Sequence, residues 1–171
     1  MAKKVSLRQF QEGLVARLKE VQSGTIAQSA SKMGVQVGGE KWLVNLPDVS
    51  EVVPLPPLLA VPLTQAWFAG VANVRGVLYS TIDFSRFLGG EPTQTNLDSR
   101  LLLANTKFHL NVGIIVHHML GLKNPDQLQG SAIDNCPPWI TAEYTDSNGG
   151  LWKELNMPGL INHPDFLNVG V

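Results

Sequence analysis

The first regular pattern in the chain covers residues 6–22, where apolar side chains recur at every third or fourth position. This spacing places them on one face of an α-helix. The face contains Leu7, Phe10, Leu14, Leu18 and Val21. The helix packs either on its own domain or on a partner, and the pattern leaves both possibilities open. Small and polar residues follow, so we expect residues 1–32 to form a helix and linker, and residues 33–171 a separate domain.

From Met33 onward the pattern changes to the two-residue alternation that is typical of β-strands. Gly38-Gly39 indicates a hairpin turn between the first two strands, and Gly76 indicates a second tight turn. Asp83 has the position of an N-cap before a short helix. Further strands are predicted within residues 77–82, 101–104, 109–119, 140–144 and 151–155, and a last short helix within residues 162–167. Many short strands and few helices predict a mainly β fold of small barrels or a sandwich.

Composition narrows the class of protein. The chain has 171 residues, enough for one domain or for two small lobes that share a core. Charged residues make up 16%, against roughly 25% in an average domain, and this is compatible with surfaces that partners cover. The net charge of −1 leaves no basic excess for binding nucleic acid.

The same composition favours a cytoplasmic protein. Polar residues interrupt the basic start of the chain, so no signal peptide is expected. No apolar run approaches the roughly 20 residues that cross a membrane. Cys136 is the single cysteine, which excludes a disulfide framework or a cysteine zinc site within one chain and fits a reducing compartment.

Candidate catalytic groups are few. The histidines are His109, His117, His118 and His163. Because His117 and His118 are neighbours in a predicted strand, we expect them to face opposite sides and not to share a metal. His109 and His117 would lie on the same face of that strand, but eight residues of extended chain separate them by ~26 Å. The motifs of zinc sites, phosphate loops and nucleophile elbows do not occur, so we predict a protein that is not an enzyme and has no metal or cofactor.

One alternative to a protein without catalytic activity stays open at this point. A fold can bring Ser, His and Asp together from distant positions, which no spacing rule detects. A small-molecule sensor or hydrolase on a β-barrel scaffold is therefore the alternative function.

A family resemblance rests on several blocks within residues 42–88. Trp42-Leu43-Val44-Asn45-Leu46 is followed by Val49-Ser50-Glu51-Val52-Val53, and residues 67–78 contain the pattern G-x-x-N-x-R-G. Thr81-Ile82-Asp83-Phe84 follows at matching spacing. Together these blocks resemble the CheW family of chemotaxis coupling proteins.

The resemblance extends over about residues 33–170 but departs from the family in one place. Val112 to Val116 is similar to a strand after which the family usually has aspartate, where this chain has His117. The segment 144–158 resembles the PilI-type members, which serve type IV pilus systems.

The resemblance implies a fold of two intertwined, five-stranded SH3-like barrels with short helices and a shared hydrophobic interface. It implies an adaptor without catalytic activity or cofactor that couples chemoreceptors to a CheA-type histidine kinase. One face would bind the kinase's own CheW-like regulatory domain, and a groove between the barrels would bind the cytoplasmic tip of the receptor. We expect a cytoplasmic protein that controls twitching motility, recruited to membrane receptor arrays without membrane insertion.

Six residues match family positions that are associated with partner contacts. They are Val49, Glu51, Gly70, Asn73, Arg75 and Gly113. The Arg75 guanidinium suits carboxylates and helix-end carbonyls of a partner. It would serve equally well to link the two barrels internally, through Asp83 or a backbone carbonyl. For Gly70 and Gly76 we expect a requirement of the backbone, and for Asn73 a part in shaping the turn.

Overall fold

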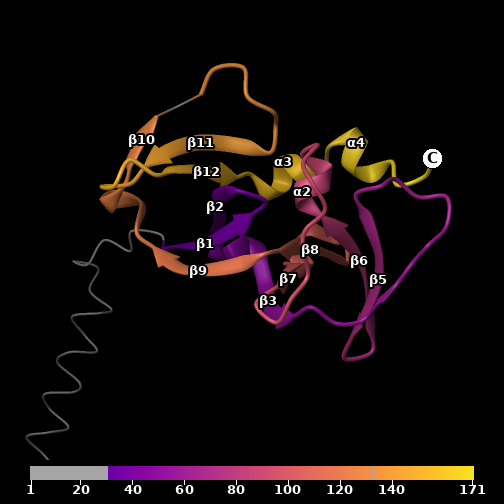
Figure 1. Ribbon diagram of the computed structural model, residues 1–171. Helices are drawn as coiled ribbons and strands as arrows, with labels where there is room; N and C mark the ends of the chain where they lie inside the picture. Colours follow the sequence, from indigo (N-terminus) through magenta and orange to yellow (C-terminus); the bar gives the residue numbers. More distant parts are fainter. Residues whose placement is uncertain (1–30, 132) are drawn as a thin grey trace, which may run out of the picture. The chain divides into compact units, whose positions relative to one another are not determined.

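A computed structural model describes residues 31–131 and 133–171 (Figure 1). The predicted N-terminal helix lies outside these residues, so the division of the chain at residues 32 and 33 stays a prediction. The described part contains two six-stranded β-sheets, here named sheet A and sheet B. The prediction of a mainly β fold is confirmed.

Sheet A combines the first two described strands with the last strands of the chain. Its strand order is β10-β11-β12-β2-β1-β9, and all neighbours are antiparallel except β12 and β2. The strands are β1 (Lys32–Val37), β2 (Glu40–Asn45), β9 (His118–Lys123), β10 (Gln129–Ser131), β11 (Ile140–Thr145) and β12 (Leu151–Leu155). Val37 pairs with Glu40 across the turn at Gly38, which has φ +59°, so the predicted hairpin is confirmed.

Sheet B is built from the middle of the chain. Its order is β3-β7-β8-β6-β5-β4, with one parallel pair, β6 and β8. The strands are β3 (Val49–Pro54), β4 (Leu58–Leu59), β5 (Phe68–Val74), β6 (Val77–Asp83), β7 (Arg100–Ala104) and β8 (Val112–Val116). Each sheet thus has five main strands and one short strand at an edge.

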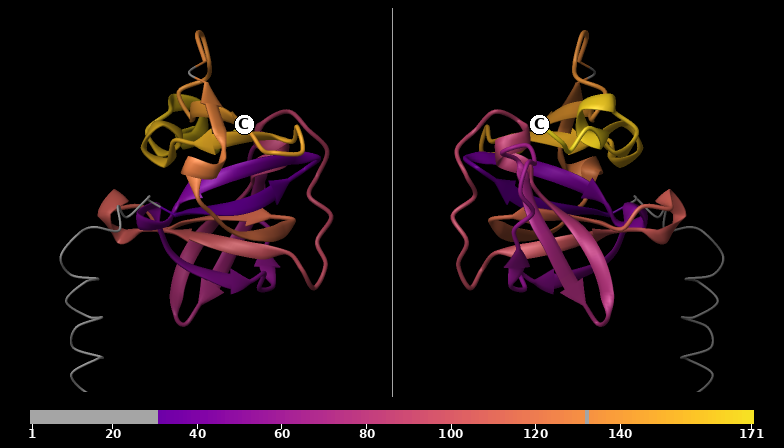
Figure 2. Two further views of the ribbon diagram at one scale, coloured as in Figure 1. Left: turned by 90° about the vertical axis from the view of Figure 1, so that its left-hand side faces the viewer. Right: turned by 90° about the vertical axis from the view of Figure 1, so that its right-hand side faces the viewer.

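The two sheets are intertwined because the chain passes from one to the other and back. It leaves sheet A between β2 and β3, through the 3-10 helix η1 (Leu46–Asp48), and returns between β8 and β9. Strand β2 is paired with β12, with Trp42 opposite Lys153. In both views of Figure 2 the indigo strands β1 and β2 lie between the orange and yellow C-terminal elements and the magenta strands of sheet B.

The helices are short. The Asp83 carboxylate accepts a hydrogen bond from the Arg86 N–H at the start of α2, so the predicted N-cap is confirmed. Helix α3, which Asn156 caps in the same way, was not predicted from the sequence. The described helices are α2 (Phe84–Phe87), α3 (Met157–Ile161) and α4 (Pro164–Leu167), and the remaining 3-10 helices are η2 (Thr106–Phe108) and η3 (Pro125–Gln127).

The strands of sheet B bury side chains on both faces. Leu102 and Ile114 belong to a large core shared with sheet A and the helices. Leu101, Leu103 and Ile115 belong to a second core inside sheet B. This follows from the alternation of side chains along a strand, and it explains the continuous apolar runs in β7 and β8.

The expected strand over residues 109–119 is two strands in different sheets. His109 has φ +55° and ends η2, outside any strand. The chain changes sheets at His117, between β8 and β9. The rings of His117 and His118 therefore contact each other, with centroids 4.1 Å apart. The prediction of opposite faces was wrong because alternation holds only within one strand.

Candidate partner-binding site

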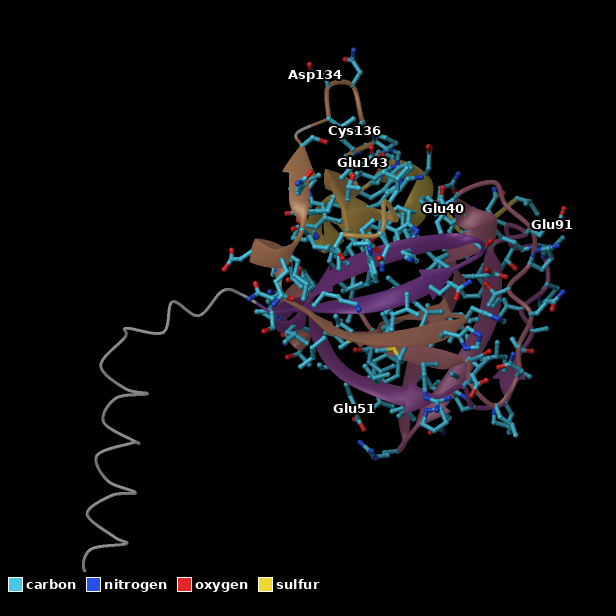
Figure 3. The ribbon with its side chains drawn as sticks, turned by 60° about the vertical axis from the view of Figure 1, so that its left-hand side comes forward. Glu40, Glu51, Glu91, Asp134, Cys136 and Glu143 are labelled. Carbon is cyan, nitrogen blue, oxygen red and sulfur yellow. The ribbon has the colours of Figure 1, made fainter. Side chains whose placement is uncertain are left out.

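Two residues that the sequence reading singled out form an ion pair. Arg75 Nη1 donates to Glu51 Oε2 and Arg75 Nη2 to Glu51 Oε1, each at 2.6 Å. This two-pronged geometry is the strong form of an arginine–carboxylate contact. Glu51 lies on β3, at one end of the sheet B order, and Arg75 joins β5 to β6 near the other end. In Figure 3, Glu51 projects from the end of the domain that is opposite to Asp134.

The hairpin between β5 and β6 holds Arg75 in position. Arg75 and Gly76 form a two-residue loop, with φ +52° and +86°. Hairpins of this type need positive φ at both residues, which glycine tolerates better than arginine does. The Asn73 side chain stabilises the loop by accepting a hydrogen bond from the Gly76 N–H at 2.8 Å. The part expected for Asn73 in the turn is confirmed.

The pair is electrostatically coupled but exposed to solvent. The hydrogen bonds from Arg75 lower the pKa of Glu51, and those to Glu51 raise the pKa of Arg75. The side chains are 73% exposed for Arg75 and 36% for Glu51. Such pairs add little to stability in water. The two hydrogen bonds to Glu51 orient the guanidinium at the surface without adding much to the stability of the fold.

The proposed internal link from Arg75 to Asp83 does not form. Asp83 instead caps α2 and accepts hydrogen bonds from the N–H and the hydroxyl of Thr93, at 2.9 and 2.7 Å. The Arg75 fork connects two parts of sheet B and does not join the two sheets.

Gly70 and Gly113 are buried, and they shape sheet B. Gly70 has φ +132°, and a Cβ there would lie 2.4 Å from the backbone oxygen of Leu59. A Cβ on Gly113 would lie 2.7 Å from Leu101 Cδ1 in the second core. Both positions need glycine for close packing. Val49 is half-buried against the shared core at the start of β3.

Exposed apolar side chains, which were not predicted from the sequence, lie beside this pair. Leu59 is 73% exposed and Leu78 is 60% exposed. Leu59 is opposite Val71 in the β4–β5 pair, and Leu78 is opposite Asn73 in the β5–β6 pair. We name this outer face of β4, β5 and β6 the sheet B face. A signal was present: the chain has no charged residue or histidine between Glu51 and Arg75.

Two open grooves lie elsewhere on the domain. The hairpin groove, of about 580 Å³, is lined by residues 36–40 and 88–94 with Ser85 and His117. The proline groove, of about 590 Å³, is lined by residues 55–58 and 95–97. Figure 3 labels Glu40 and Glu91, which line the hairpin groove from two segments distant in the sequence.

The described residues hold one cysteine and no metal-binding cluster. They contain no group of three or more His, Cys, Asp or Glu placed to hold a metal ion. Cys136 is half-buried, and its Sγ donates to the Ile140 carbonyl at 3.2 Å. None of the helices in the described ranges is long and apolar enough to span a bilayer.

Comparison with known proteins decides the family. The model of the CheW-like domain matches residues 32–165. The chain belongs to the CheW-like domain family. Among CheW-like relatives, protein PilI of Pseudomonas aeruginosa PAO1 is 33% identical over 171 residues, covering 96% of this chain and 90% of PilI. The chemotaxis protein CheW of Rhizobium meliloti is 30% identical over 81 residues, covering 47% of this chain and 52% of that protein.

A solved CheW structure supports the fold. The scaffolding protein TtCheW from Thermoanaerobacter tengcongensis superposes with a TM-score of 0.61 at 17% identity, covering 74% of this chain and 88% of TtCheW. The resemblance read from the motifs around Gly70 to Gly76 is confirmed. The chain is a CheW-like adaptor related to PilI.

Proposed function

We propose that this CheW-like adaptor couples chemoreceptors to a CheA-type histidine kinase in a system that controls type IV pilus twitching motility. The observation that carries the proposal is the similarity to PilI over 96% of the chain. The protein acts by binding, without turnover, in the cytoplasm at membrane receptor arrays.

The sheet B face, together with Glu51 and Arg75, is the proposed contact for the kinase's CheW-like regulatory domain. Exposed Leu59 and Leu78 supply apolar area, and Asn73 and Arg75 supply polar groups at the rim. An apolar centre with a polar rim is the usual anatomy of a protein interface. The Arg75 guanidinium keeps N–H groups beyond the two that bind Glu51, and these can reach a partner's carbonyls. Val49, Gly70 and Gly113 support this surface from within sheet B.

The hairpin groove is the proposed site for the receptor tip. It lies between the β1–β2 hairpin of sheet A and the segment that follows α2, at a junction of the two sheets. Its walls expose peptide groups at two glycine pairs, Gly38-Gly39 and Gly89-Gly90. Exposed backbone groups suit the polar end of a helical hairpin.

The alternative of a hydrolase or small-molecule sensor gains no support from this groove. Ser85 is buried, and its hydroxyl donates to the Glu91 carbonyl at 2.7 Å. His117 Nδ1 lies 3.0 Å from the Gln94 carbonyl. Both side chains are engaged with the backbone of the groove wall.

Calorimetric titration with two fragments tests the proposal. They are the CheW-like domain of a CheA-type kinase from the same organism, and the cytoplasmic hairpin of a chemoreceptor from that organism. We expect saturable binding of both, with dissociation constants at or below tens of micromolar. Failure of both fragments to bind at that concentration would overturn the proposed function.

A further inference from the structure

One segment forms a wall of both grooves. Residues 91–98, here named the strap, connect α2 to β7 without regular secondary structure. Residues 91–94 line the hairpin groove, and residues 95–97 line the proline groove. The two walls are consecutive in the chain. Neighbouring Cα atoms are about 3.8 Å apart, so a shift of one wall is transmitted directly to the other.

Side chains hold the strap in place. The N–H and hydroxyl of Thr93 donate to Asp83, and His117 Nδ1 contacts the Gln94 carbonyl. Arg100 Nη1 donates to the Leu97 carbonyl at 2.7 Å. The Ser85 hydroxyl donates to the Glu91 carbonyl at 2.7 Å, and the Ser99 N–H, just after the strap, donates to the Asn96 carbonyl at 3.1 Å.

Apart from these tethers, the strap is exposed to solvent and is not covered by other parts of the domain. All of its residues except Thr93 are exposed, and Leu97 is 95% exposed. Segments with exposed residues and few backbone hydrogen bonds open at low free energy. The tethers at Thr93 and Gln94 lie where one groove ends and the other begins. They form a pivot between the two grooves.

We propose that the strap couples the two grooves, so that filling the hairpin groove displaces the strap and widens the proline groove. This inference rests on the proposed function for its biological meaning, because the hairpin groove is the proposed receptor site. The proline groove adjoins β4, whose Leu59 belongs to the sheet B face. In this way a displacement caused by receptor binding in the hairpin groove would be passed along the strap to the proline groove, beside the kinase contact.

The test fills the hairpin groove without any partner. A Cβ on Gly39 would meet nothing within 4 Å, so Gly39→Cys fits the fold. In a Cys136→Ser background, this thiol is alkylated with a bulky maleimide. The readout is the hydrogen exchange of the Asn96 and Ser99 amides, which are paired with Ser99 Oγ and the Asn96 carbonyl. We expect exchange at least tenfold faster than in the unlabelled variant.

The matched control is Ser147→Cys, labelled in the same way on an exposed turn between β11 and β12. Unchanged exchange at Asn96 and Ser99, or equal acceleration by the control label, would overturn the coupling. Acceleration at the buried Ile114 amide would show that the label unfolds the domain. In that case the same maleimide is attached at Gln36→Cys, which lines the same groove. Faster exchange at Asn96 and Ser99 with this label supports the coupling, and unchanged exchange overturns it.

A partner experiment separates this inference from the proposed function. With the label at Gly39→Cys, we expect the affinity for the kinase's CheW-like domain to change at least fivefold, the lower end of usual coupling. If neither the kinase domain nor the receptor hairpin binds any version of the chain, the proposed function is overturned. The exchange readout uses no partner, so it would still decide the coupling.

Discussion

Lys32, on the first strand of the domain, forms a buried ion pair with Glu154, on the last strand. Lys32 Nζ lies 2.6 Å from Glu154 Oε1, and the two side chains are 11% and 8% exposed. Each side chain has a further partner, because Lys32 also donates to Asn45 Oδ1 and Glu154 Oε2 accepts from the Tyr144 hydroxyl. The pair joins segments 122 positions apart in the sequence.

Removing one partner of this pair should destabilise the domain strongly. Lys32→Met leaves a carboxylate buried without its cation, which typically costs roughly 3–5 kcal/mol. The measurement is the free energy of unfolding in urea. The matched control is Lys153→Met, which breaks the ion pair with Glu40 whose side chains are 29% and 49% exposed. The control should cost below about 1 kcal/mol, and equal losses would contradict the buried role of Lys32.

The phenol of Tyr144 should ionise at a higher pH than that of an unperturbed tyrosine. Burial and the hydrogen bond to Glu154 raise its pKa from 10.0 to about 12. Because the folded pKa lies above the unfolded value, the stabilisation is complete below about pH 10 and is lost as the pH rises toward about 12. The pKa of Tyr144 is measured by absorbance titration of the phenolate, with the Tyr144→Phe variant as the reference. Glu154→Gln should bring the transition closer to pH 10, and a Tyr144 transition already near pH 10 in the unaltered chain would contradict this assignment.

Reversing the charges of Arg75 and Glu51 should show whether Arg75 contacts the partner directly or only shapes the hairpin. Arg75→Glu places two carboxylates together and should weaken binding of the kinase domain at least tenfold. The double variant Arg75→Glu with Glu51→Arg restores an ion pair at the surface. If Arg75 touches the partner, the double variant should keep the melting temperature within a few degrees while binding stays weak. Full recovery of binding would show instead that the pair only shapes the hairpin.

Gly70 should tolerate no side chain. Gly70→Ala places a methyl group 2.4 Å from the Leu59 backbone oxygen at φ +132°. Strain against backbone belongs to the mutations with large effects, and we expect a loss of roughly 3 kcal/mol in the free energy of unfolding. Gly39→Ala is the control, since its Cβ meets open space. A loss at Gly70 no larger than at Gly39 would contradict the close approach of β4 to β5.

The sequence predicted the features whose signals are local. The Gly38-Gly39 turn, the Asp83 cap and the loop at Gly76 each depend on residues within a few positions of one another. The conformations of these few residues determine the turn, the cap and the loop, and contacts with distant segments are not needed.

Features that depend on distant segments could not be read in this way. The partner of Arg75 is Glu51, 24 positions away, and no spacing rule distinguishes it from Asp83. The chain changes sheets at His117 inside a run that looks continuous, because β8 is buried and β9 begins without a turn signal. The grooves arise where separate segments meet, so their residues share no motif.

The parallel pairing of β2 with β12 has a consequence for how the protein is made. Sheet B is complete once residues 49–116 have left the ribosome, since all six of its strands lie within that span. The β1–β2 hairpin leaves earlier but must wait for Leu151–Leu155 before its open edge is covered. Pairings between such distant segments form slowly because of the large loop that they close. During synthesis the edge of β2, one of the first strands to form, is therefore among the last edges of the domain to be covered.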